Sequence, residues 1–68
     1  MYNKNKLKAA IAEKGMNQAE TAKKIGMSPV TFNRKLQKGT FGIDEANALT
    51  AVLEIKNPCE IFFAEQAT

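Results

Sequence analysis

The chain has 68 residues, a net charge of +3, one cysteine and no histidine. A chain this short forms one domain at most, and its core is marginal without efficient helix packing or a partner subunit. One cysteine and no histidine exclude an internal disulfide and leave too few ligands for a zinc or iron–sulfur site, so we expect no cofactor. No apolar run approaches the roughly 18 residues of a membrane span, and we expect a cytoplasmic protein.

The charge is unevenly distributed along the chain. Residues 1–38 carry nine basic and two acidic side chains, a balance of +7, whereas residues 39–68 carry one basic and five acidic side chains, a balance of −4. A basic front half favours a polyanion as its partner. Chance clustering of lysines on a solvated surface would give the same pattern, so charge alone does not identify that partner.

Apolar periodicity and helix end signals predict an all-α fold in a single domain, residues 1–68, with five helices and no strand. We expect the helices at residues 5–14, 17–25, 29–37, 43–54 and 58–63. The second helix begins with a capping-box pair, Asn17 and Glu20. Ser28 and Pro29 are the clearest start signal, because serine caps free amides and proline suits the first helical position.

Each expected helix has one apolar face. In the first three helices we expect the inward residues to be Leu7, Ala10, Ile11, Ala19, Ala22, Ile25, Phe32 and Leu36. In the last two we expect them to be Ile43, Ala46, Leu49, Val52, Leu53, Ile61 and Phe62 or Phe63. The link Gly26-Met27 between the second and third helices is so short that it forces a sharp angle, as in a helix-turn-helix.

Burial of Phe32 and Leu36 leaves a polar face on the third helix that is suited to DNA. Arginine can pair with guanine, asparagine or glutamine with adenine, and apolar groups can touch a thymine methyl. We therefore expect base contacts from Pro29, Val30, Thr31, Asn33, Arg34 and Gln37. We expect phosphate contacts from Gln18, Ser28, Lys35 and Lys38.

The stretch from Asn17 to Leu36 resembles the helix-turn-helix of the lambda-repressor-like family, which includes phage repressors, Cro-type proteins and Xre-type bacterial regulators. The matching positions are Gln18, Ala22, Gly26, Ser28 and Phe32, and the segment from Ile43 to Phe63 is similar to the family's last two helices. The resemblance implies a five-helix DNA-binding domain with the helix-turn-helix at helices 2 and 3. It also implies a small Cro-like repressor of phage or prophage type, acting on a double-stranded DNA operator in a prokaryotic or phage-infected cell.

Three positions depart from the family pattern. Thr21 and Lys35 stand where apolar residues are usual, and Gly42 is a weaker cap than the usual serine. These departures bear on the register of the third helix's second half, and with it the expected roles of Arg34, Lys35 and Gln37.

One recognition helix reads only a few base pairs, so we expect a homodimer, with Phe62 and Phe63 as candidate interface residues. The residue types of an enzyme site are missing, and no small-molecule ligand is evident. The alternative is a protein-binding anti-repressor whose acidic back half faces a basic partner; a module that only dimerises is a third possibility. Lys4, Lys6 and Lys8 fit a solvated helix face better than a DNA-binding arm.

Overall fold

The computed structural model describes residues 2–62, and within them every regular element is a helix. The helices are α1 (Lys4–Glu13), α2 (Gln18–Lys24), α3 (Pro29–Lys38), α4 (Ile43–Val52) and α5 (Cys59–Phe62). This confirms the all-helical fold class. Each helix lies where the sequence predicts one, with ends that differ by at most two residues, and residue 63 lies outside the described range.

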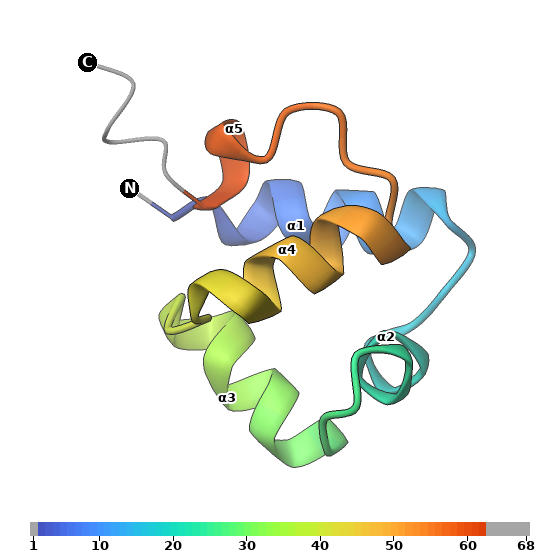
Figure 1. The fold of residues 1–68 in the computed structure, drawn as a ribbon. Coiled ribbons are helices and arrows are strands. Elements are labelled where there is room, and N and C mark those ends of the chain that lie inside the picture. The colour runs from blue at the N-terminus through green and yellow to red at the C-terminus, as the bar shows by residue number, and fades with distance from the viewer. Residues whose placement is uncertain (1, 63–68) are drawn as a thin grey trace.

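Figure 1 shows α4 crossing α1 in the middle of the molecule, with α2 and α3 below them and α5 beside the start of α1. The two ends of the described chain meet there, because the backbone N–H of Asn3 donates to the carbonyl oxygen of Ile61 at 2.7 Å. The long connection between α4 and α5 runs along the side of the molecule away from α3 and brings the chain back to its beginning (Figure 1).

The core lies where the four longer helices converge. Leu7, Phe32, Leu36 and Leu49 are fully buried, and they come from α1, α3 and α4. Ile11, Ala22, Leu53 and Ile61 complete the cluster, so all five helices contribute. Because Phe32 and Leu36 are four residues apart, they hold one face of α3 against the core and leave the opposite face to solvent.

The buried face of α2 differs from the predicted one. Ala19 is exposed, whereas Thr21 is fully buried and Ile25 is half-buried. The inward residues follow the i, i+3, i+4, i+7 pattern from Gln18 rather than the three-residue ladder from Ala19. Burial of Thr21 is tolerated because its hydroxyl donates to the carbonyl oxygen of Asn17 at 2.9 Å.

The start of α4 also corrects the prediction, since Ile43 is 72% exposed instead of buried. Ile43 is the first residue of the helix and lies at the edge of the core. Ala46, Leu49 and Leu53 are buried, and Val52 is half-buried and packs against them. Gly42 has no side chain with which to cap α4. Its backbone N–H is instead bonded to the Glu45 carboxylate at 2.9 Å.

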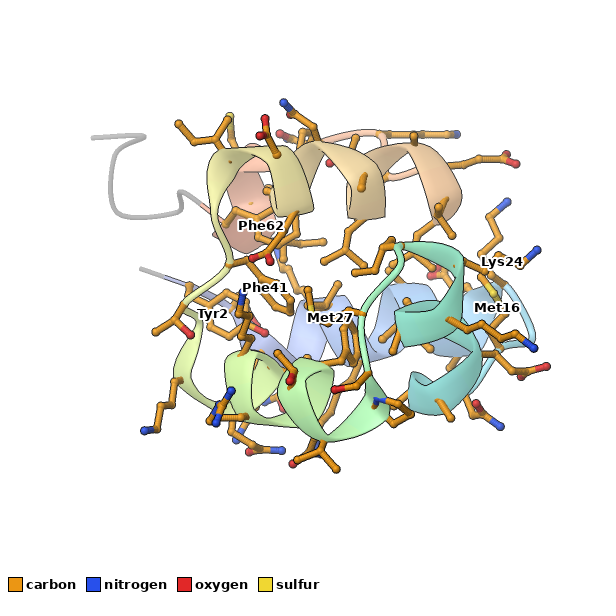
Figure 2. The ribbon with its side chains drawn as sticks, turned by 60° about the horizontal axis from the view of Figure 1, so that its bottom comes forward. Tyr2, Met16, Lys24, Met27, Phe41 and Phe62 are labelled. Carbon is orange, nitrogen blue, oxygen red and sulfur yellow. The ribbon has the colours of Figure 1, made fainter. Side chains whose placement is uncertain are left out.

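An aromatic cluster closes the core at the end of the molecule where the chain's two ends meet. The ring of Tyr2 lies 6.3 Å from that of Phe41 and 6.4 Å from that of Phe62, and the Phe41 and Phe62 rings are 6.2 Å apart. Figure 2 shows these three residues gathered on one side of the molecule. Phe62 is therefore half-buried and packed against the core, and the other candidate interface residue, Phe63, lies outside the described residues.

Candidate nucleic-acid interface

The connection between α2 and α3, residues 25–28, makes the sharp turn that the sequence predicts. Gly26 adopts a left-handed backbone with φ of +73°, and the N–H of Met27 closes the end of α2 on the carbonyl oxygen of Ala22 at 2.9 Å. The small, fully buried Ala22 lets α3 approach, while Ile25 and Met27 pack against the core. Figure 2 shows Met27 in the middle of the molecule. This geometry is that of a helix-turn-helix.

The face of α3 away from the core forms one exposed stripe. Val30, Arg34 and Lys38 follow each other at four-residue intervals, and Asn33 and Gln37 flank them on one side. All five are exposed, and Val30 has 77% of its surface in solvent. An apolar side chain held this far out, among amide and cationic groups, is available for contact with another molecule.

The side chains of Ser28 and Thr31 make hydrogen bonds that cap the N-terminus of α3. The Ser28 hydroxyl oxygen accepts the N–H of Thr31 at 3.2 Å and donates to the Thr31 hydroxyl at 2.9 Å. Ser28 therefore works as the helix cap that the sequence predicts. Thr31 is half-buried and Pro29, the first helical residue, is exposed.

One edge of the stripe is bordered by α2. The side-chain amide of Asn33 donates to the side-chain oxygen of Gln18 at 2.9 Å. Asn33, a predicted base-contacting residue, is thus bonded to Gln18, a predicted phosphate-contacting residue. The other edge is bordered by α4. There the Lys35 ammonium lies 2.6 Å from the Glu45 carboxylate, and both side chains are partly buried.

The Lys35–Glu45 pair gives the two edges of α3 different electrostatic properties. The Lys35 ammonium, followed by the N–H of Gly42, lowers the pKa of the Glu45 carboxyl. The charge of Lys35 is thus largely balanced within the protein, whereas neither Arg34 nor Lys38 has an ion pair among residues 2–62. The departure noted at Lys35 has a structural reason, since Leu36 fills the core position and Lys35 turns towards α4.

The N-terminal segment is a part of this region that sequence reasoning missed. The Tyr2 hydroxyl donates to the carbonyl oxygen of Leu36 at 2.8 Å, in the last turn of α3, where helix carbonyls lack partners. Burial of the phenol raises the pKa of Tyr2 to about 12. The Lys4 ammonium donates to the Gln37 side chain at 3.0 Å. A single aromatic residue before the first helix has no periodicity that could signal such a contact.

Ion pairs with lysines also reduce the number of unpaired carboxylates in the acidic back half, residues 39–68. Glu60 lies 3.7 Å from Lys6, Glu54 lies 3.0 Å from Lys14, and Glu45 is bound to Lys35. Three of the five carboxylates that could have formed a face for a basic protein partner are thus paired with lysines, namely Lys6 in α1, Lys14 directly after α1 and Lys35 in α3. Glu65 lies outside the described residues.

No group of three or more metal-ligating side chains gathers within residues 2–62. None of the helices formed by these residues is long and apolar enough to cross a membrane.

Residues 3–39 match a family model described as bacterial regulatory protein, Fis family. The match includes α1, α2 and α3 in full and covers more than half of the chain. Comparisons with curated proteins and with solved structures found no match.

Proposed function

Because the chain belongs to the Fis family of bacterial regulatory proteins, its helix-turn-helix is that of a DNA-binding transcription regulator, and we propose that it is a sequence-specific repressor of the Cro-like phage or prophage type. The finer assignment depends on the likeness of residues 17–36 and 43–63 to the lambda-repressor-like family. In this proposal α3 enters the major groove of a double-stranded operator.

The observation that carries the proposal is the solvent-facing stripe of α3. It combines an apolar group that is 77% exposed, Val30, with amides at Asn33 and Gln37 and a cation at Arg34. These are the residue types that distinguish base pairs in the major groove, since the apolar group meets a thymine methyl and the polar groups meet base edges. Pro29 and Thr31, at the start of the helix, would lie at the rim of the same contact.

The proposed phosphate contacts are Gln18, Ser28, Lys35 and Lys38. Lys38 is the best supported of the lysines, because it is exposed and no acid neutralises it among the described residues. Lys35 has the least support, since a phosphate contact would compete with its 2.6 Å contact to Glu45. Gln18 accepts a hydrogen bond from the side chain of Asn33, so in this proposal it supports Asn33 as well as contacting the DNA backbone.

A homodimer is the assembly we propose on DNA, with its two α3 helices on half-sites about one turn, or 34 Å, apart. Phe62 is a weaker interface candidate than its sequence position indicates, because its ring packs against Tyr2 and Phe41. The anti-repressor alternative loses its main support for a similar reason, since Glu45, Glu54 and Glu60 are paired within the protein.

Selection of bound sequences from random duplex DNA tests the proposal. Wild type should enrich one motif, with two related half-sites if it binds as a dimer. Arg34→Ala should relax the preference at one base position and cost about 1–3 kcal/mol there, without changing the other positions. Lys56→Ala is the matched control, because Lys56 is an exposed cation in the α4–α5 connection, away from α3 (Figure 1). A folded wild type that enriches no motif would contradict the proposal.

A further inference from the structure

The lysines near the N-terminus, which the sequence presents as one group, are separated by the fold. The Lys4 ammonium reaches α3 and lies 3.0 Å from the Gln37 side-chain oxygen. The Lys6 ammonium points to the other side of α1 and lies 3.7 Å from Glu60 in α5. Within residues 2–62, Lys4 is the member of this group that is hydrogen-bonded to a side chain of α3.

Lys4 continues an edge that begins with Gln18. Gln18 is bonded to Asn33, and Lys4 is bonded to Gln37, which lies one turn further along the same side of α3. Four residues of an α-helix rise by about 6 Å, so α2 and α1 each place one polar side chain at successive turns beside the recognition helix. On the opposite edge Lys35 is neutralised by Glu45.

The segment that carries Lys4 is held firmly in place. The Tyr2 hydroxyl is bonded to Leu36, the N–H of Asn3 is bonded to Ile61, and the Asn3 side chain caps α1 through the N–H of Lys6. Lys4 is therefore a fixed cation at the border of α3 and not part of a mobile arm. Its side chain gives up less conformational freedom on binding than that of an unanchored lysine.

The position of Lys4 is unfavourable for the isolated fold. It is the first residue of α1, and the first turn of this helix contains no acidic residue. The partial positive charge of a helix N-terminus disfavours a cation there. The same arrangement strengthens attraction for an anion, because the helix dipole and the ammonium act in the same direction.

We propose that Lys4 binds a backbone phosphate of DNA and extends the contact surface of α3 along the edge that starts at Gln18. This inference rests on the proposed function, since it assumes that α3 lies in the major groove. The partner is duplex DNA recognised by charge, so the contact is independent of base sequence.

The test is the salt dependence of binding to a duplex of random sequence, with Lys4→Met compared with wild type. Each neutralised phosphate contributes about 0.9 to the slope of log K against log salt concentration. Lys4→Met should reduce the magnitude of the slope by about 0.9, and Lys4→Arg should preserve it. Lys6→Met should leave it unchanged, because Lys6 is directed towards Glu60.

The outcomes separate the two proposals. If wild type binds no duplex DNA, the proposed function fails and the role of Lys4 fails with it. If wild type binds but Lys4→Met keeps the wild-type slope, only the role of Lys4 is refuted. Circular dichroism and thermal unfolding check the fold, and we expect Lys4→Met to be no less stable than wild type, since it removes a cation from a helix N-terminus.

Discussion

Alanine at Gly39 should destabilise the protein more than alanine at Gly26, although the two glycines share a left-handed backbone with φ of +71° and +73°. A Cβ at Gly26 meets nothing within 4 Å, whereas a Cβ at Gly39 would lie 2.5 Å from Cδ2 of Tyr2. The Tyr2 ring cannot easily withdraw, because its hydroxyl is bonded to Leu36 and its ring contacts Phe41.

The magnitudes follow from these two contributions. Holding an alanine in the left-handed region costs about 1–2 kcal/mol, and this applies at both positions. Overpacking adds about 1–3 kcal/mol at Gly39 alone, for a total of about 2–5 kcal/mol. A domain of this length has a free energy of unfolding of roughly 3–10 kcal/mol, so Gly39→Ala removes a large part of it.

Urea unfolding followed by circular dichroism measures both variants, and a double-mutant cycle with Tyr2→Ala isolates the clash with the ring. Without the Tyr2 ring, the cost of Gly39→Ala should fall towards that of Gly26→Ala, which corresponds to a coupling of up to about 3 kcal/mol. A remainder is expected, because the Cβ of residue 2 stays 2.9 Å from the added Cβ. Equal costs for the two alanines in the wild-type background, or additive effects of Gly39→Ala and Tyr2→Ala, would refute the reasoning.

Two further predictions concern pH. Tyr2→Phe should lower the free energy of unfolding by about 0.5–1.5 kcal/mol through loss of the bond to Leu36. Burial raises the pKa of Tyr2 from 10.0 to about 12. The protonated phenol therefore makes its full contribution to the free energy of unfolding below about pH 10, and this contribution is lost as the pH rises towards 12. Tyrosinate absorbance reports this residue alone, since the chain has one Tyr and no Trp, and ionisation of the folded protein near pH 10 would contradict the prediction. The pKa of Glu45 is lowered by Lys35, so its stabilising effect is present above the ordinary value of 4.5 and is lost as the pH falls below it. Thermal unfolding across this range should show less acid sensitivity for Glu45→Gln than for wild type, and equal sensitivity would show that the pair contributes nothing.

Signals between near neighbours in the sequence were sufficient to predict the positions of the helices and the turn between α2 and α3. Asn17 and Glu20 start α2 through two reciprocal hydrogen bonds, and both are present. Ser28 starts α3 by accepting the N–H of Thr31, with Pro29 as the first helical residue. Phe32 and Leu36 orient α3 by a spacing that any isolated helix would share. Such signals involve residues only a few positions apart, which is why they can be recognised in the sequence.

The rotation of each helix was harder to predict, because it depends on neighbours that are distant in the sequence. Ala19 and Thr21 are both compatible with a core, and only the packing of α2 against α3 and α4 decides that Thr21 is buried. Ile43 is apolar and has the right spacing, yet it lies beyond the edge of the core. Periodicity describes the faces of a helix but does not say where the core ends.

For the candidate interface, the sequence by itself determined that α3 carries a polar outer face with Asn33, Arg34 and Gln37, because burial of Phe32 and Leu36 leaves no other side for them. Only the tertiary structure decided what borders that face. Lys4 and Gln37 are separated by 33 positions, and Tyr2 and Leu36 by 34. Likewise, the positive charge of Lys35 is balanced by Glu45, which lies in another helix. Contacts of this kind arise when the helices pack, so the segment pattern that identifies the recognition helix carries no information about them.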